Sequence, residues 1–236
     1  MRERTVVIIP ALNEEASLGN VLREIPKRMV NEVVVVDNGS TDKTARVARG
    51  LGATVVSEPA RGYGSACLAG IEYISKKYKN GSTIVVFMDG DHSDHPEEME
   101  RIVGPLKRYS YDMVVGTRTG DGVEKGAMGV HVKLGNLLIC RTLSIVLRKR
   151  ITDLGPFRAI RLSALRRLDM QERTFGWTVE MAVKSTHRGL MVKEVPVSYR
   201  KRTGRSKISG SLGAGLRTMI SMLAAMMRHH LQALST

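Results

Sequence analysis

Two carboxylates, Asp89 and Asp91, follow directly on an apolar run that begins at Thr83, with Gly90 between them. Such a run, rich in β-branched residues and without a polar face, is typical of a strand buried on both sides in a parallel sheet. Its carboxyl end meets solvent, and the glycine lets a ligand approach the backbone. Because Mg²⁺ and Mn²⁺ are held by one or two carboxylates together with phosphate oxygens, the triplet predicts a divalent-cation site. A solvated acidic loop is the alternative on this triplet alone.

Polar residues also follow the other strands that the sequence predicts. Four such strands are expected over residues 5–9, 32–36, 54–56 and 112–115. The polar residues and glycines after them are Asn13 and Glu14, Asp37 and Asn38, Arg61 and Gly62, and Arg118. These groups suit a nucleotide diphosphate, and their recurrence favours the cation site over the solvated loop.

Segments with helical spacing lie between the predicted strands. They cover residues 18–25, 41–49, 66–78 and 96–106, the last with Asp94 or His95 as its expected N-cap. Alternating strands and helices predict parallel βαβ units, which place ligands in the crevice at the carboxyl ends of the strands. The fold class expected is therefore α/β, with a mostly parallel, Rossmann-like sheet.

Length and cysteine content limit the protein class further. A chain of 236 residues suits one large domain, or a domain with an appendage. Cys67 and Cys140 lie in helix-like segments without metal-ligand spacing, which favours a reducing compartment. Because Met1 leads into the first strand without an apolar signal core, we expect the catalytic face to be cytoplasmic.

Positive charge is concentrated in the second half of the chain. Residues 1–124 carry 16 Lys and Arg against 18 Asp and Glu, whereas residues 125–236 carry 21 against 5. A field of this sign attracts nucleic acid, an anionic membrane or a phosphate-bearing substrate. With 10 aromatic residues among 236, the stacking platforms of a nucleic-acid binder are scarce, so we expect no nucleic-acid partner.

Two apolar helices studded with cations are predicted in the basic half, over residues 128–150 and 212–231. A transmembrane helix needs about 20 predominantly apolar residues. Arg141 splits the first segment, and Arg217 and Arg228 bracket a run of ten in the second, so neither is expected to span a bilayer. An interfacial position and a core position remain equal alternatives for the first helix, and the interface is favoured for the second.

A basic loop and two isolated carboxylates complete the candidate residues. The loop, residues 199–210, contains five cations and flexible glycines that can close around a phosphate, although a solvated charge run is the alternative. Asp153 and Glu180 each lie among apolar residues. Either one can be a hydrogen-bonded structural acid or can face the reacting group.

Taken in order, these motifs resemble those of family-2 inverting glycosyltransferases, and most closely the polyprenyl-phosphate (dolichyl-phosphate) hexosyltransferases such as dolichyl-phosphate mannose synthase. The motifs are Pro10-Ala-Leu-Asn-Glu14, Val36-Asp-Asn-Gly-Ser40, Arg61-Gly-Tyr-Gly64, Asp89-Gly-Asp91, Gly155-Pro-Phe-Arg158 and Arg202-Thr-Gly-Arg-Ser-Lys207. The resemblance covers roughly residues 5–210.

The resemblance implies a nucleotide-sugar donor, a Mg²⁺ or Mn²⁺ cofactor and a role for each matching position. Asp89 and Asp91 are implied as metal ligands, and Asp91, Arg118 and Asp153 are the catalytic candidates. The residues implied to bind the nucleotide sugar are Pro10, Ala11, Asn13, Glu14, Asp37, Gly39, Arg61, Gly62, Asp89 and Gly90. Those implied to bind the acceptor phosphate are Arg118, Arg202, Ser206 and Lys207.

The same resemblance divides the chain. Residues 1–210 are expected to form the glycosyltransferase domain, with a nucleotide-sugar half over 1–120 and an acceptor half over 121–210. Residues 211–236 are expected to form an amphipathic, interfacial helix. Many relatives continue into transmembrane helices, so a peripheral enzyme on the cytoplasmic face of the membrane is expected here. Leu12, Asn38 and the loop after Asp91 depart from the usual pattern, which leaves the base and a third metal ligand open.

The acceptor decides the chemistry that the residues must supply. A phosphate monoester, with a second pKa of about 6, is already a competent nucleophile at neutral pH and needs no base. A hydroxyl acceptor needs a carboxylate base, for which Asp153 and Glu180 are the candidates. We expect hexose transfer to a polyprenyl phosphate, with mannose from GDP-mannose first and glucose from UDP-glucose second. A soluble hydroxyl acceptor, a nucleotidyltransferase and a basic nucleic-acid binder are the alternatives.

Overall fold

The computed structural model describes residues 3–79, 82–204 and 212–234. Its strands are β1 (Arg4–Ala11), β2 (Glu32–Asp37), β3 (Thr54–Ser57), β4 (Thr83–Phe87), β5 (Met113–Thr117), β6 (Arg158–Arg161) and β7 (Val192–Pro196). Its helices are α1 (Leu18–Glu24), α2 (Thr44–Gly50), α3 (Tyr63–Lys77), the 3₁₀ turn η1 (Pro96–Glu98), α4 (Met99–Arg108), α5 (Val130–Val146), α6 (Leu162–Leu168), α7 (Trp177–His187) and α8 (Leu212–Leu234). The strands and helices expected from the sequence are present, with ends shifted by a few residues.

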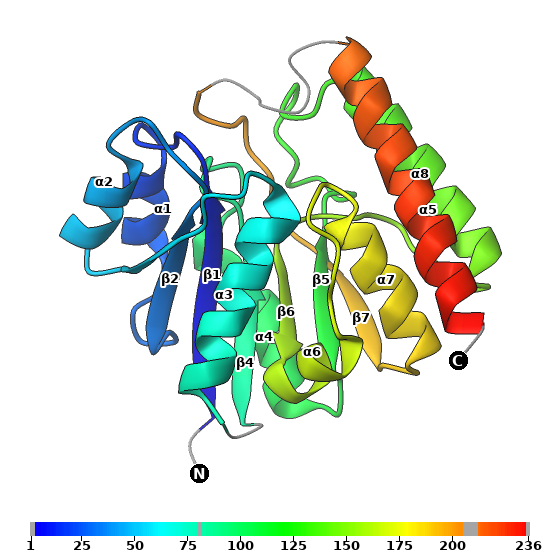
Figure 1. Ribbon diagram of the computed structural model, residues 1–236, viewed down its shortest axis with the longest axis horizontal. Helices are drawn as coiled ribbons and strands as arrows, with labels where there is room; N and C mark the ends of the chain where they lie inside the picture. The colour runs from blue at the N-terminus through cyan, green and yellow to red at the C-terminus, as the bar shows by residue number, and fades with distance from the viewer. Residues whose placement is uncertain (1–2, 80–81, 205–211, 235–236) are drawn as a thin grey trace.

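The strands form one sheet in the order β3-β2-β1-β4-β6-β5-β7 (Figure 1). All neighbouring pairs are parallel except those made by β6, which is antiparallel to both β4 and β5. The carboxyl ends of the six parallel strands therefore meet at one edge, as the α/β prediction required. The amino end of β6 lies at that same edge, because its direction is reversed.

Strand β6 was not expected from the sequence. It is only four residues long, and Arg158, which opens it, is a charged residue that is buried here. Its guanidinium donates to the carbonyl oxygen of Gly155 and lies 5.9 Å from the ring centre of Trp177. Because β6 pairs with strands on both sides, residues from both expected halves of the domain share a single sheet.

Helices cover both faces of the sheet. Side chains of α1 and α4 pack on one face, with Leu18 and Ile102 fully buried against Ile9 and Val86 of the sheet. Helices α3, α6 and α7 pack on the other, where Ile74, Leu165 and Trp177 meet Ile8 and Phe87. The two layers fix the strand ends, and with them the loops that carry the polar motifs.

Helices α5 and α8 lie side by side at one end of the molecule and pack against α7 (Figure 1). They share a separate apolar cluster that includes Leu143 of α5, Val183 of α7 and Met226 of α8. Each helix therefore has a core face, and α8 is not a detached appendage. No helix in the described part of the chain combines the length and hydropathy needed to cross a bilayer, as the sequence predicted.

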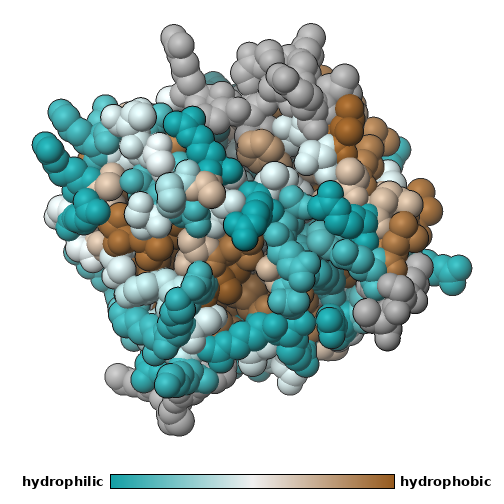
Figure 2. Space-filling model, viewed as in Figure 1, coloured by the Kyte–Doolittle hydropathy of each residue, from teal (hydrophilic) through white to brown (hydrophobic). Residues whose placement is uncertain are grey.

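The outer faces of α5 and α8 carry exposed apolar side chains. Val130 and Ile145 of α5 are 74% and 77% exposed, and Ile220 of α8 is 56% exposed. Figure 2 shows hydrophobic residues gathered along the edge of the molecule where these helices lie. Several exposed apolar side chains gathered on two neighbouring helices mark an interaction site more often than single exposed residues do.

We predict that Gly70→Ala destabilises the fold by about 1–3 kcal/mol, because a Cβ there overpacks the contact between α3 and β1. That atom would lie 2.7 Å from Cγ2 of Ile8. Gly50→Ala at the end of α2 is the control, since its Cβ would meet nothing within 4 Å. Urea unfolding measures both variants, and equal stabilities would contradict the packing described here.

Candidate active site

Three carboxylates lie together after β4, at the edge where the parallel strands end. The side-chain oxygen Oδ1 of Asp89 is buried and makes no hydrogen bond with any described residue. Asp91 is also buried, and its Oδ1 accepts hydrogen bonds from the backbone N–H and the hydroxyl of Ser93, at 2.9 and 2.5 Å. Oδ2 of Asp94 accepts the backbone N–H of Asp89 at 3.0 Å.

His95, one of the two residues expected to cap the helix that begins at residue 96, is the N-cap residue of η1. It makes no capping hydrogen bond through its side chain. Asp94 instead turns back to Asp89 and adds a third negative group to the pair identified from the sequence. The sequence cannot distinguish these two uses of an Asp, because both satisfy a backbone N–H nearby.

Electrostatics at this edge favour a bound cation. Burial, and then the charges of Asp91 and Asp94, raise the pKa of Asp89 well above its usual range. Burial and the charge of Asp91 likewise raise the pKa of Asp94 to about 7. A divalent ion would relieve this repulsion and supply a partner for Oδ1 of Asp89. The described residues include no group of three His, Cys, Asp or Glu arranged around a common metal position, so further ligands would come from phosphate or water.

The basic loop reaches the carboxylates. The guanidinium of Arg202 lies 3.3 Å from Oδ2 of Asp91 and 3.3 Å from Oε1 of Glu14, bridging the ends of β1 and β4. The backbone N–H of Thr203 donates to the carbonyl oxygen of Asp91 at 2.9 Å. Arg202 thus supplies positive charge where the cation site is predicted. Ser206 and Lys207 lie outside the described residues.

Arg118 and Asp153 form a tight ion pair next to this site. The backbone N–H, Nε and Nη2 of Arg118 all donate to the Asp153 carboxylate, at 2.7 to 2.8 Å. Burial alone would raise the pKa of Asp153, but the hydrogen bonds and charge of Arg118 outweigh it and hold the pKa below its usual value. Asp153 is therefore ionised and already bonded, which makes it a support for Arg118 rather than a free base.

Tyr199 covers the Arg118 guanidinium, whose central carbon lies 5.2 Å from the ring centre. Burial raises the pKa of Tyr199 to about 12, so its hydroxyl stays neutral. The residue was predicted only as the start of the basic loop. Its isolated bridges to Asp94 and Val123 place that loop along the site.

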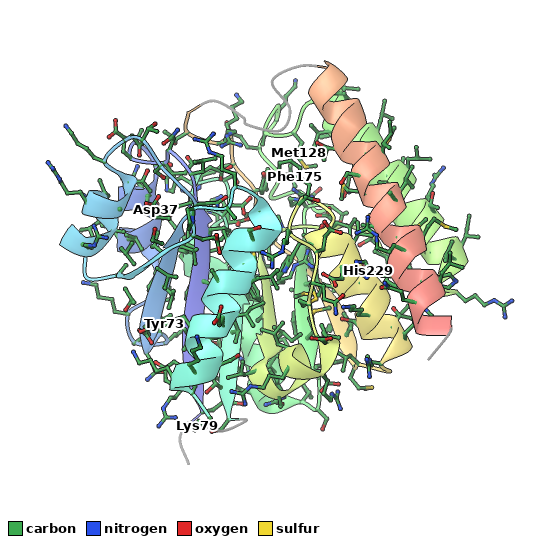
Figure 3. The ribbon with its side chains drawn as sticks, in the orientation of Figure 1. Asp37, Tyr73, Lys79, Met128, Phe175 and His229 are labelled. Atoms are coloured by element: carbon green, nitrogen blue, oxygen red, sulfur yellow. The ribbon has the colours of Figure 1, made fainter. Side chains whose placement is uncertain are left out.

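The loops after β1 and β2 are tied together at the predicted nucleotide side. The Asn13 side-chain oxygen accepts the N–H of Thr41 at 2.8 Å, and the N–H of Asn13 donates to the hydroxyl of Ser40 at 3.0 Å. Asp37, at the end of β2, accepts the N–H of Ser40, and Gly39 takes a positive φ of 76° in this turn. Figure 3 shows Asp37 at the strand-end edge of the molecule.

Asn38 explains one departure from the family pattern. Its amide donates to the carbonyl oxygens of Glu58 and Ala60, both at 2.9 Å, and its oxygen accepts the N–H of Gly62 at 2.8 Å. A carboxylate could not donate the first two bonds. Asn38 therefore joins the ends of β2 and β3.

The remaining predicted residues lie around the same edge. Pro10 and Ala11 end β1, and the carbonyl oxygen of Gly90 accepts the Ser17 hydroxyl at 2.8 Å. Arg61 is exposed beside Gly62 at the start of α3. Glu180 lies apart from these residues. It is buried in α7, where its carboxylate accepts the backbone N–H groups of Gln171 and Glu172 at 2.9 and 2.8 Å, as a hydrogen-bonded structural acid does. The other candidate residues within the described part of the chain are at the strand-end edge or in loops bordering it.

A cavity of about 540 Å³ opens from this edge toward α5 and α8. Asp89, Arg118 and Tyr63 line it at the strand ends, and Phe175 lies along its course. Its remaining lining is mostly apolar and comprises His131, Val132, Leu134, Gly135, Asn136, Leu138, Ile139, Leu154, Pro156, Thr178, Gly215, Thr218, Met219 and Met222. The sequence indicated the two helices through their apolar spacing, but not the cavity between them.

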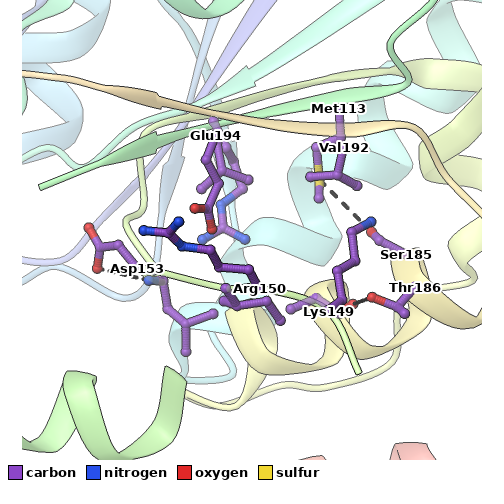
Figure 4. Close-up of a pocket in the computed structure, with 13 residues that line it drawn as sticks. Met113, Lys149, Arg150, Asp153, Ser185, Thr186, Val192 and Glu194 are labelled. Atoms are coloured by element: carbon purple, nitrogen blue, oxygen red, sulfur yellow. Dashed lines mark hydrogen bonds between the residues drawn. The ribbon is translucent and has the colours of Figure 1, made fainter. Parts of the chain in front are cut away.

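A second cavity, of about 60 Å³, has Asp153 in its lining (Figure 4). Asp153, Arg150 and Glu194 line it, and the Arg150 side chain points toward the side where the two carboxylates lie. Ligand pockets typically measure about 300–1,000 Å³. This cavity has room for a few water molecules, and the larger one is the substrate-sized space.

A sheet edge with paired carboxylates, clustered arginines and a substrate-sized cavity defines an α/β enzyme that acts on a phosphorylated ligand. Residues 6–169 match the family Glycosyl transferase family 2, and the chain belongs to that family. It is a glycosyltransferase, as the motifs indicated.

Relatives and solved structures extend this comparison. An uncharacterised glycosyltransferase of Mycobacterium tuberculosis is 36% identical over 89% of this chain and 92% of its own length. The dolichyl-phosphate hexose transferase of Haloferax volcanii is 31% identical, over 88% of this chain and 87% of its own length. Glucosyl-3-phosphoglycerate synthase of M. tuberculosis, solved with Mn²⁺, UDP and glucosyl-3-phosphoglycerate, superposes with a TM-score of 0.76 at 25% identity, over 96% of this chain and 80% of that one.

We predict that Asp153→Asn lowers the free energy of unfolding by roughly 3–5 kcal/mol at pH 7, because it leaves the buried Arg118 charge without its partner. A carboxyl group with a depressed pKa stabilises the fold above its unfolded pKa of about 3.9, and this contribution is lost as pH falls through the folded pKa.

Urea unfolding should therefore show the gap between wild type and Asp153→Asn closing as the pH falls below about 4. Asp121→Asn, at an exposed carboxylate in the loop after β5, is the matched control and should change little. A gap that stays constant with pH would contradict the assigned ion pair.

Proposed function

We propose that this glycosyltransferase moves a hexose, with inversion, from a nucleotide sugar to a polyprenyl phosphate at a membrane surface. Mannose from GDP-mannose is the first candidate donor and glucose from UDP-glucose the second. The observation that carries the proposal is the apolar cavity, which begins at Asp89 and Arg118 and extends between α5 and α8.

The cavity lining matches a phosphorylated lipid better than a small polar acceptor. Its residues on α5 and α8 include Leu134, Leu138, Ile139, Met219 and Met222. Burying one methylene group stabilises a complex by about 0.8 kcal/mol, whereas a small polar molecule has no such surface to bury. The names of two relatives agree: the Haloferax enzyme above and an undecaprenyl-phosphate mannosyltransferase of Micrococcus luteus, 28% identical over 89% of each chain.

Protein groups can direct the reaction without a general base. Arg118 lines the cavity next to Asp89, and its pairing with Asp153 fixes it in place to hold an acceptor phosphate. Asp91 and Asp89 would hold Mg²⁺ or Mn²⁺, which neutralises the departing nucleoside diphosphate when bound. Arg202 adds positive charge on the same side. Asp153 is already hydrogen-bonded to Arg118 and is not free to act as a general base. A phosphate acceptor, which is itself a nucleophile at neutral pH, needs no such base.

A soluble phosphorylated acceptor is the second candidate. The fold resembles glucosyl-3-phosphoglycerate synthase, which was solved with UDP and its glucosylated product. A basic site next to the carboxylates would serve phosphoglycerate as well as a lipid phosphate. The two candidates differ in the cavity, which a soluble acceptor would leave largely empty.

We also propose that the enzyme is peripheral and docks on the cytoplasmic face of an anionic membrane through α5 and α8. The exposed apolar residues of α5 are accompanied by the exposed cations Lys133, Arg141 and Arg148. An amphipathic helix of this kind places its apolar side in the headgroup region and its cations beside anionic lipid heads. Such docking would open the cavity toward the lipid acceptor.

We predict that lipid-extractable product forms from UDP-glucose or GDP-mannose with a short-chain polyprenyl phosphate and Mn²⁺, and that 3-phosphoglycerate does not replace the lipid. Gly135→Leu should raise the KM for the lipid by about tenfold or more, since displacing two methylene groups costs roughly 0.8 kcal/mol each. Gly135 lines the cavity, and its Cβ would meet nothing within 4 Å.

Gly50→Ala, remote from the cavity, is the control, and the affinity for the nucleoside diphosphate should be unchanged in both variants. Product with 3-phosphoglycerate alone would favour the second candidate. No product from either donor with either acceptor would overturn the proposal.

We predict that the protein floats with anionic liposomes and that raising the salt concentration weakens this binding. Replacing Ile145 and Ile220 by serine removes two exposed apolar side chains from α5 and α8 and should release most of the bound protein. Leu51→Ser is the matched control, because Leu51 is exposed beyond the end of α2. Equal flotation of all three proteins would exclude this docking surface.

A further inference from the structure

Tyr63 lies beside Asp89, yet neither residue's buried oxygen is satisfied. The Tyr63 hydroxyl and Oδ1 of Asp89 are both buried and lack a hydrogen bond of normal geometry with the described residues, although the hydroxyl is near enough to Asp89 to offset part of the rise in the pKa of that carboxyl. Both residues line the large cavity. A buried polar atom without a well-formed partner costs about 1–3 kcal/mol, so two of them at one cavity indicate a bond that reaches normal geometry in another state of the site.

The position of Tyr63 is fixed by its neighbours. Its ring packs edge-to-face on Trp177, with ring centres 6.0 Å apart, and Trp177 is itself fully buried against Phe87. Tyr63 is therefore held in place by packing against α7, which itself packs on β4.

Two glycines allow the chain to hold Tyr63 there. The N–H groups of Gly64 and Ser65 donate to the carbonyl oxygens of Thr174 and Arg173, at 3.2 and 2.9 Å. A Cβ on Gly62 would lie 2.2 Å from the carbonyl oxygen of Arg173, so only glycine permits this approach. The Arg-Gly-Tyr-Gly motif thus packs backbone against backbone and leaves the tyrosine facing the carboxylates.

The Tyr63 hydroxyl is a hydrogen-bond donor at neutral pH, as any tyrosine hydroxyl is. Burial first, and then the charge of Asp89, raise the pKa of Tyr63 well above its usual value. The hydroxyl therefore keeps its proton at all physiological pH values. Asp89 offers a carboxylate whose terminal torsion is soft enough to rotate within its site.

We propose that the Tyr63 hydroxyl donates a hydrogen bond to Asp89 when that carboxylate binds its divalent cation, and so positions it. This inference rests on the proposed function. Groups that orient a metal ligand typically change metal affinity by about 10–100-fold when they are removed. Tyr63 is a positioning residue in this assignment, because it acts through Asp89.

Tyr63→Phe tests the proposal, since it keeps the ring packing and removes only the hydroxyl. Mn²⁺ affinity, measured by electron paramagnetic resonance with UDP or GDP present, should fall about 10–100-fold. Turnover should recover at saturating Mn²⁺. In the metal-free protein, urea unfolding should show a smaller loss of stability than the Tyr73→Phe control, because the Tyr63 hydroxyl makes no hydrogen bond of normal geometry there.

Tyr73→Phe is the matched control on the same helix. Its hydroxyl bonds to Glu32 at 3.0 Å, far from the strand-end edge (Figure 3). It should lose roughly 0.5–1.5 kcal/mol of stability and keep its Mn²⁺ affinity.

Unchanged Mn²⁺ affinity in Tyr63→Phe would overturn the inference, as would a stability loss equal to that of Tyr73→Phe. Wild-type protein that binds no Mn²⁺ with either nucleotide would instead contradict the metal site of the proposed function.

Discussion

Like charge confined at the end of β4 is the constraint on which the site depends. Asp89, Asp91 and Asp94 lie within six residues. Burial first, and then their mutual repulsion, raise the pKa of Asp89 and of Asp94. A fold gains nothing from such an arrangement unless positive charge is brought to it. In this structure Arg202 provides part of that charge by bridging Asp91 and Glu14. A divalent metal ion that binds together with a diphosphate would supply the rest of the positive charge at these three carboxylates.

The scaffold explains how residues far apart in sequence meet there. Parallel strands deliver their carboxyl ends to one edge, and the reversed strand β6 brings the segment containing Asp153 to the same edge beside Arg118. The ion pair with Asp153 then fixes the Arg118 guanidinium at the strand-end side of an apolar cavity, which α5 and α8 complete. The polar half of the site therefore belongs to the sheet and the apolar half to the helices. This division matches an acceptor with a charged head and an apolar tail.

The sequence predicted the elements that obey simple periodicities. The composition of a buried strand such as Thr83–Phe87 is enough to predict it. A parallel sheet then implies that Asp37, Asp89 and Arg118 lie at the same edge. Strand β6 was missed because four residues beginning with a buried arginine carry no strand pattern. The partners of Asp94 and Asp153 were also beyond prediction, since a carboxylate bonds whatever donor the tertiary structure brings to it. The cavity depends on the packing angle of α5 and α8, which spacing along one helix does not encode.

The carboxylates after β4 are expected to hold a divalent cation together with the diphosphate of a nucleotide sugar. The most direct measurement is a crystal structure of the protein soaked with Mn²⁺ and a nucleoside diphosphate, with the metal located by its anomalous scattering. We predict one strong peak in contact with Asp89 and Asp91, with Arg202 turned from Asp91 toward the diphosphate. A peak at any other position, or a bound nucleotide with no metal beside these carboxylates, would contradict the account.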